Sequence, residues 1–152
     1  MPKITPFLCF DNKAEEAANF YASTFKDSTV LSVTSGPDGE SMAAAFRIDG
    51  QEFLAVNGCP VTAFTEAISF MIQVETQEEI DELWEKLSEG GEKLPCGWLK
   101  DKYGLAWQVD PVQIGEWLSD QDPEKSKRVM DAVLKMGKLE IETLKKAYEG
   151  SA

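Results

Sequence analysis

Histidine is absent from this chain of 152 residues. Histidine is the commonest transition-metal ligand and the usual general base near neutral pH, so its absence excludes Ser-His and Cys-His catalysis. Metal sites built only from carboxylates and thiolates remain open, but the sequence contains no Cys-x-x-Cys pattern. We therefore expect no tightly bound metal and no cofactor.

Basic clusters, paired cysteines and long apolar runs are missing as well. The 27 acidic residues outnumber the 15 basic ones, and the net charge of −12 would repel a phosphate backbone. Three cysteines, an odd number without close spacing, indicate reduced thiols rather than a disulfide framework. No run of about 18 apolar residues could span a bilayer, and the N-terminus lacks the pattern of a signal peptide. We expect a cytoplasmic protein that binds neither nucleic acid nor membranes.

The first 60 residues predict a βαβββ module. The expected elements are a strand at 3–10, a helix from Ala14 to about Phe25, a strand at 28–35, and a hairpin of strands 41–48 and 51–57. Asp49-Gly50, between the last two strands, is the dipeptide typical of a two-residue hairpin turn.

Residues 66–111 repeat this order in a trimmed form. The pattern predicts a strand at 67–75, a helix that begins with a Thr76–Glu79 capping box and ends at Gly90-Gly91, and two short strands at about 94–100 and 104–110. Residue matches support a duplication: EEAANFY (15–21) resembles EEIDELW (78–84), and IDGQEFLAV (48–56) resembles KDKYGLAWQV (100–109). Chance similarity between amphipathic segments is the alternative explanation.

Residues 112–150 predict a helical tail. Asp122-Pro123-Glu124 is a good helix start, and a last helix is expected near 139–149. The first of these helices carries an apolar stripe of Val129, Met130, Val133 and Leu134. We expect this stripe to be buried, either against the chain's own sheet or against a partner subunit.

Five segments together resemble a known family. They read FDNKAEEAANFY, FRIDGQEFLAVNG, EAISFMIQVETQEEIDELWEKLSEGG, CGWLKDKYGLAWQV and DPEKSKRVMDAVLKM, and they run through nearly all of the chain. They resemble the PhnB-like proteins of the glyoxalase/bleomycin-resistance/dioxygenase (vicinal-oxygen-chelate, VOC) superfamily. This family is often labelled 3-demethylubiquinone-9 3-methyltransferase.

The resemblance implies an α+β fold in which paired βαβββ modules form a curved, mostly antiparallel sheet around a pocket, in a homodimer. One domain, residues 1–152, would comprise module one at about 1–60, module two at about 66–111 and the tail at about 112–150. Metal-dependent relatives take their ligands from the first and last strands of each module. The corresponding positions here are Thr5, Ala55, Ser69 and Gln108, three of which could not hold a transition metal tightly.

The turn at Asp49-Gly50 also assigns side chains to the two faces of the hairpin. Counting outward pairs Arg47 with Glu52, Phe46 with Phe53, Ala44 with Ala55 and Met42 with Asn57. One face then holds Ala43, Ala45, Leu54 and Val56 and is expected to pack against helices. The other holds Met42, Ala44, Phe46, Phe53, Ala55 and Asn57. We assign the second face to the pocket because it contains Ala55, the counterpart of Gln108.

The expected ligand-binding residues are Thr5, Phe46, Phe53, Ala55, Asn57, Ser69 and Gln108. An aromatic pair beside small alanines would leave volume for an apolar ligand, and the polar members would orient it. Ordinary core filling is the alternative for the two phenylalanines. Cys96 could be a nucleophile, but without histidine a structural thiol is the favoured interpretation. The acid pairs Glu15-Glu16 and Glu78-Glu79 occupy helix starts, where carboxylates offset the helix dipole.

These features favour a metal-free protein that binds a small molecule, with an acidic character suited to a cationic or aromatic ligand. The alternative is an enzyme of the same superfamily, including the 3-demethylubiquinone-9 3-methyltransferase activity of the family label. A Rossmann-type methyltransferase needs a glycine-rich turn after a strand, and the sequence has none. A structural dimerisation module is a third hypothesis, if side chains fill the pocket.

Overall fold

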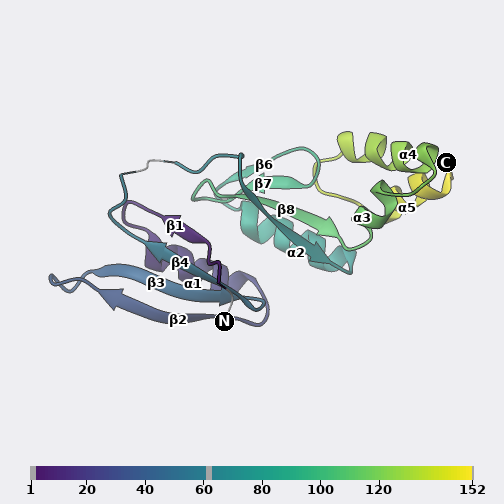
Figure 1. Cartoon of the computed structure of the whole chain (residues 1–152). Coiled ribbons are helices and arrows are strands. Elements are labelled where there is room, and N and C mark those ends of the chain that lie inside the picture. Colours follow the sequence, from purple (N-terminus) through teal and green to yellow (C-terminus); the bar gives the residue numbers. More distant parts are fainter. Residues whose placement is uncertain (1–2, 61–62, 152) are drawn as a thin grey trace. The chain divides into compact units, whose positions relative to one another are not determined.

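The computed structural model describes residues 3–60 and 63–151. Figure 1 shows its elements in chain order: β1 (Phe7–Cys9), α1 (Ala14–Thr24), β2 (Ser28–Ser35), β3 (Ser41–Ile48), β4 (Gln51–Val56), β5 (Ser69–Val74), α2 (Gln77–Ser88), β6 (Glu92–Lys93), β7 (Trp98–Lys100), β8 (Ala106–Pro111), α3 (Ile114–Leu118), α4 (Pro123–Leu134) and α5 (Ile141–Glu149). The chain divides into two compact units, residues 1–63 and 64–152. That the two units form a single domain stays a prediction.

The first unit is a βαβββ module, as the sequence predicts. Its four strands are ordered β1-β4-β3-β2, with β1 parallel to β4 and the other pairs antiparallel. The predicted hairpin register is confirmed, because Phe46 pairs with Phe53 and Ala44 with Ala55. Asp49 and Gly50 both have positive φ (44° and 86°), which a tight hairpin turn of this length requires and which explains the Asp-Gly dipeptide.

Helix α1 covers one face of the first sheet. Its buried residues recur at helical spacing and are Ala14, Ala17, Ala18 and Tyr21. The small alanines let the helix lie close to the sheet, and it packs mainly on β2 and β3 (Figure 1). The buried apolar surface along this contact is the core of the first unit.

The second unit repeats the module. Its strands are ordered β5-β8-β7-β6, again with the outer pair β5–β8 parallel. The predicted capping box is confirmed: the Thr76 hydroxyl accepts a 3.2 Å hydrogen bond from the Glu79 backbone N–H. Helix α2 then buries Ile80, Trp84 and Leu87.

Two predicted strands need correction. The strand expected at 94–100 is interrupted, because Pro95 lacks a backbone N–H and the next two residues, Cys96 and Gly97, both have positive φ (66° and 82°). Only the short pairs of β6 and β7 remain on either side of this bend. The first strand, expected at 3–10, is shorter and spans Phe7–Cys9.

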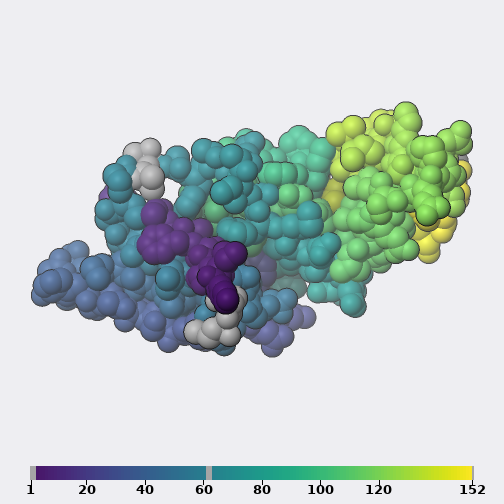
Figure 2. All heavy atoms as spheres, viewed as in Figure 1, coloured from purple at the N-terminus to yellow at the C-terminus, as the bar shows by residue number. Residues whose placement is uncertain are grey.

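The tail is helical, as predicted, and packs as part of the second unit. Its core consists of Ile114, Val129, Val133, Leu139 and Leu144. Two residues of the predicted apolar stripe are therefore covered by the tail's own helices, whereas Met130 and Leu134 stay exposed. In Figure 2 the tail is the part of the surface coloured green to yellow. None of the helices in the described part of the chain is long and apolar enough to cross a membrane.

Candidate functional site

The face of the first sheet that we assigned to a pocket is instead the core of the first unit. Phe46, Phe53 and Ala55 are buried. The ring of Tyr21 from α1 stacks on Phe46 at a centroid distance of 5.8 Å, and Phe46 stacks on Phe53 at 5.1 Å. The prediction that Phe46, Phe53 and Ala55 line an open pocket is therefore wrong, and the alternative of core filling is correct for the two phenylalanines. The physical reason is that α1 covers this face and not the other.

Asn57 completes the start of α1. Its side-chain oxygen accepts a 2.8 Å hydrogen bond from the backbone N–H of Ala14, the first residue of the helix. Its side-chain nitrogen donates to the backbone carbonyl of Ser41 at 3.1 Å. Both polar groups of this amide therefore have structural partners, and it holds the end of β4 against the helix N-terminus.

The opposite face of the first sheet, which we call open face 1, is partly exposed and largely apolar. It carries Phe7, Cys9, Ala43, Ala45, Leu54 and Val56, which by alternation point away from α1. Phe7 and Leu54, which are direct neighbours across β1 and β4, are 57% and 39% exposed. The pair Arg47–Glu52, with a 2.9 Å ion pair, lies on the same side. Thr5, just before β1, is exposed, and Figure 2 shows the N-terminal segment in purple at the surface.

The corresponding face of the second sheet, open face 2, carries a polar pair. Leu99, Trp107 and Val109 are buried on the side of α2, so Gln108 points to the other side. The Gln108 side-chain nitrogen donates to the Ser69 hydroxyl at 2.9 Å. The structure thus brings together two of the predicted site residues.

Apolar side chains flank this polar pair. Met71 of β5 and Trp98 of β7 are the direct cross-strand partners of Gln108 on its two sides. Met71 is 54% exposed and Trp98 is half-buried. A polar amide between an exposed thioether and an indole is the arrangement expected of a small-molecule contact surface, in which apolar groups give affinity and few polar groups fix orientation.

Asp110 is a buried carboxylic acid near the end of β8. It is 5% exposed, and burial raises its pKa from the ordinary value of 3.8 to about 6. Gly97 lies beside it: a side chain at position 97 would meet Asp110 Oδ1 at 3.2 Å and Leu139 at 2.9 Å. The absence of a side chain at Gly97 therefore lets both Leu139 and the Asp110 carboxyl group pack against this position.

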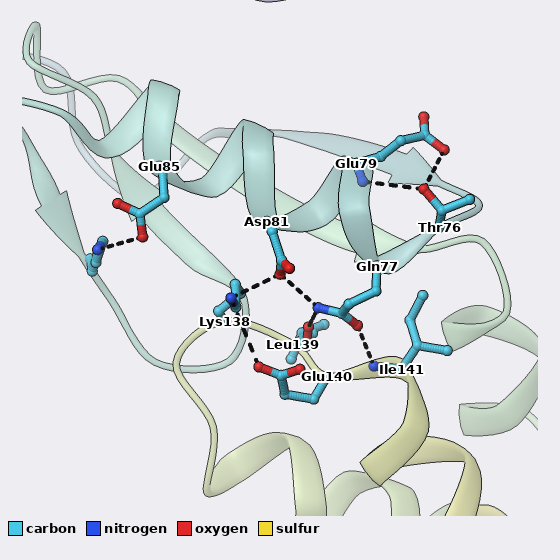
Figure 3. A network of polar contacts seen from close by, with 10 residues as sticks. Thr76, Gln77, Glu79, Asp81, Glu85, Lys138, Leu139, Glu140 and Ile141 are labelled. Carbon is cyan, nitrogen blue, oxygen red and sulfur yellow. Dashed lines mark hydrogen bonds and ion pairs between the residues drawn. The ribbon is translucent and has the colours of Figure 1, made fainter.

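The tail is clamped onto α2 by residues that the sequence analysis missed (Figure 3). The Gln77 side-chain nitrogen donates to the carbonyl of Leu139 at 3.0 Å, and its oxygen accepts from the N–H of Ile141 at 2.7 Å. One turn further along α2, Asp81 forms a 2.8 Å ion pair with Lys138. No local pattern could have indicated these contacts, because the partners lie about 60 residues apart.

Cys96 also belongs to this tail contact. Its backbone N–H donates to the carbonyl of Met136 at 2.8 Å, and Gly97 donates to Gly137 at 2.8 Å. The Cys96 side chain packs against the apolar core of the tail. These contacts agree with the interpretation of Cys96 as a structural thiol.

The donor atoms available do not fit a transition metal. Within residues 3–60 and 63–151, no group of three or more His, Cys, Asp and Glu side chains is placed to hold a metal ion. Of the four ligand positions that the resemblance implies, Ala55 has no donor atom and faces α1. Ser69 and Gln108 offer neutral oxygen and nitrogen atoms that bond to each other.

Comparisons with known proteins place the chain in a family. A family model described as 3-demethylubiquinone-9 3-methyltransferase matches residues 2–110. The solved structure of the PhnB protein from Bacillus cereus, which is described with the same activity, is 38% identical with a TM-score of 0.67. It covers 72% of this chain and 99% of its own. A comparison with curated proteins finds no match.

More distant structures share the fold. Protein PA1353 from Pseudomonas aeruginosa is 20% identical with a TM-score of 0.60, covering 73% of this chain and 98% of its own. The fosfomycin resistance protein FosX from Listeria monocytogenes, solved with Mn(II) and sulfate, is 16% identical with a TM-score of 0.54, covering 72% and 91%.

The paired βαβββ modules and these neighbours define an α+β protein of the glyoxalase/VOC fold. The chain belongs to the 3-demethylubiquinone-9 3-methyltransferase family of PhnB-like proteins. The family model ends at residue 110, so α3, α4 and α5 lie outside the matched segment.

Proposed function

We propose that this protein binds a small molecule on open face 2 without the help of a transition metal, and that it does so as a cytoplasmic homodimer. The observation that carries the proposal is the 2.9 Å hydrogen bond from the Gln108 side chain to the Ser69 hydroxyl. Met71 and Trp98 are the cross-strand neighbours of Gln108 on its two sides. This amide and hydroxyl can exchange their mutual bond for bonds to a ligand, while the indole and thioether supply apolar contact. Thr5, exposed before β1, lies in the first unit and is a candidate ligand contact of that unit, separate from open face 2.

The charge of the protein supports a restricted ligand class. With a net charge of −12 and no histidine, the protein attracts cations and repels anionic phosphates. Trp98 offers an indole ring, the aromatic surface best suited to stacking with another ring or to holding a cation. We therefore expect an aromatic or cationic ligand rather than a phosphorylated one.

Binding is tested with protein purified without added small molecules. Native mass spectrometry reports any retained ligand, and a thermal-shift screen of aromatic and cationic compounds identifies binders. Gln108→Ala should weaken binding of each compound found, whereas Gln121→Ala, an exposed glutamine before α4, serves as the matched control. Equal affinity of the Gln108→Ala variant and the wild type would place the site elsewhere. If native mass spectrometry finds no retained ligand and no compound in the screen raises the melting temperature, the proposal of ligand binding is contradicted.

An enzyme is the second candidate because of Asp110. Its pKa of about 6 suits proton transfer near neutral pH, and alternation along β8 gives its side chain the same direction as that of Gln108. S-adenosylmethionine, the methyl donor that the family label suggests, is included in the thermal-shift screen. A stabilising effect of this compound that is lost in Gln108→Ala would favour the enzyme over the binding protein.

The proposal of a dimer is based on the exposed apolar side chains of α4. Met130 and Leu134 are 42% and 61% exposed, although the other half of the predicted stripe is buried within the tail. Light scattering of the full chain should give twice the chain mass of 16.9 kDa. A mass of one chain at tens of micromolar protein would contradict this part of the proposal.

A further inference from the structure

Cys9 and Cys59 lie together in the first unit. Cys9 ends β1 and is paired in register with Val56 of β4. After Val56 the chain turns at Gly58, whose φ is +79°, and comes back so that the N–H of Cys59 donates to the carbonyl of Phe10 at 3.2 Å. Cys59 is therefore joined by a main-chain hydrogen bond to Phe10, the residue that directly follows Cys9.

The two thiols are in direct contact. They hydrogen-bond to each other, and the Cys59 sulfur also lies 3.9 Å from the carbonyl oxygen of Val56. Chains joined by main-chain hydrogen bonds run about 5 Å apart, which is within the Cα separation that a disulfide spans. Both side chains are half-buried, so a small oxidant can reach them.

We propose that Cys9 and Cys59 form a redox-active dithiol that hydrogen peroxide converts to an intramolecular disulfide. The third cysteine, Cys96, lies in the second unit against the core of the tail and has no such partner in that core. The inference concerns a modification site in the first unit and is independent of the ligand proposed for open face 2.

The reaction transfers two electrons from the two thiols to hydrogen peroxide, which is reduced to water. The hydrogen bond with Cys59 raises the pKa of the Cys9 thiol, so Cys9 is the poorer first nucleophile and Cys59 is assigned the attack on the peroxide. The Cys59 sulfur attacks one peroxide oxygen, the O–O bond breaks, and the departing hydroxide takes up a proton to become water. Cys59 is then a sulfenic acid. The Cys9 sulfur attacks the Cys59 sulfur, the S–O bond breaks, and the departing hydroxide leaves as water with the Cys9 proton. A thiol reductant restores both cysteines by exchange.

Trypsin distinguishes the three cysteines. Cleavage after lysine and arginine places Cys9 in peptide 4–13, Cys59 in peptide 48–86 and Cys96 in peptide 94–100. The full-length protein is treated with hydrogen peroxide, blocked with iodoacetamide and digested without reductant. Mass spectrometry should then find 4–13 linked to 48–86, two hydrogens lighter than the sum of the two peptides, with 94–100 alkylated. Reductant should abolish the link.

The same oxidation in urea is the control for proximity. In the unfolded chain all three pairings compete, so peptide 94–100 should appear in links to both others. Cys96→Ser should retain the link of the folded protein, and Cys59→Ser should lose it and leave Cys9 reactive toward alkylation. Separate alkylation of Cys9 and Cys59 in the oxidised folded protein, or the same mixture of links as in urea, would overturn the proposal. The wild-type comparison stands even if a variant does not fold.

Discussion

The side-chain oxygen of Gln77 accepts a 2.7 Å hydrogen bond from the backbone N–H of Ile141, 64 residues further along the chain. Gln77 is the first residue of α2, and Ile141 is the first residue of α5. The same amide donates to the carbonyl of Leu139, so one side chain satisfies main-chain groups on both sides of residue 140. A helix N-terminus otherwise leaves its N–H groups unpaired, and Gln77 supplies the partner for α5 from another element.

Gln77→Ala should loosen the tail. The variant loses the bonds to Leu139, Ile141 and Asp81 and leaves main-chain groups unpaired, with an expected loss of about 1–3 kcal/mol in the free energy of unfolding. Hydrogen exchange should show faster exchange of the Ile141 amide, ahead of global unfolding. Glu78→Ala, an exposed position on the same helical turn, is the control and should leave that amide protected. Unchanged protection in Gln77→Ala would contradict the clamp.

Asp110→Asn should stabilise the protein at high pH only. The pKa of Asp110 is raised to about 6 in the folded protein from an ordinary value of 3.8. The stabilising contribution of the neutral acid is therefore fully present below about pH 4 and is lost as the pH rises through about 6. The neutral amide avoids this loss, so we expect a gain of roughly 2 kcal/mol at pH 8 and none at pH 4. Urea denaturation of the wild type and the variant at pH 4 and pH 8 measures this difference in the free energy of unfolding. Equal stabilities at pH 8 would show that burial of the Asp110 carboxylate does not destabilise the protein.

Substitution of Asp101 should destabilise the protein more than substitution of any other residue in the turn between β7 and β8. Its Oδ1 accepts from the N–H groups of Tyr103 and Leu105, and its Oδ2 accepts from the Trp107 indole N–H at 2.9 Å. Asp101→Ala leaves these buried donors unpaired and should cost at least about 2 kcal/mol in chemical denaturation. Asp101→Asn keeps an oxygen for the two main-chain groups but turns a donor toward the indole, so it should lose less. An equal loss for both variants would mean that the bonds to Oδ1 contribute nothing.

Local patterns predicted most of the architecture. The Asp49-Gly50 turn set the hairpin register, and the Thr76 capping box placed the start of α2. These features depend on residues a few positions apart, where backbone geometry and side-chain chemistry act directly. The interruption at 95–97 had a local signal too, because Pro95 and Gly97 disfavour a continuous strand.

The covered face of the first sheet was assigned wrongly for a physical reason. Alternation separates the two faces of a strand but does not say which one a helix covers. We chose by equating Ala55 with Gln108, yet Ala55 faces α1 whereas Gln108 faces away from α2. A better signal was available: Arg47 and Glu52 share a face with Leu54, and a charged pair marks the side that faces solvent. The tail clamp had no such signal, because it joins residues distant in sequence.

The protein should contain no stoichiometric transition metal. Histidine is absent, and Ser69 and Gln108 offer only neutral donors. Elemental analysis of dialysed protein should give substoichiometric zinc, iron and nickel. One equivalent of any of these metals after dialysis would contradict the metal-free part of the proposed function.

An alanine-to-leucine substitution on each face of the first sheet tests which face is packed and which is open. Ala55 is fully buried beneath α1, whereas Ala43, on the neighbouring strand, points to open face 1. Ala55→Leu forces extra carbon atoms against α1 and should cost about 1–3 kcal/mol through overpacking. Ala43→Leu adds the same atoms to a face that no helix or strand among the described residues of the first unit covers, and it should change the free energy of unfolding by less than about 0.5 kcal/mol. Chemical denaturation of the two variants measures the difference. If Ala43→Leu proves the more harmful, open face 1 is packed against something and Ala55 borders free volume, as the sequence first suggested.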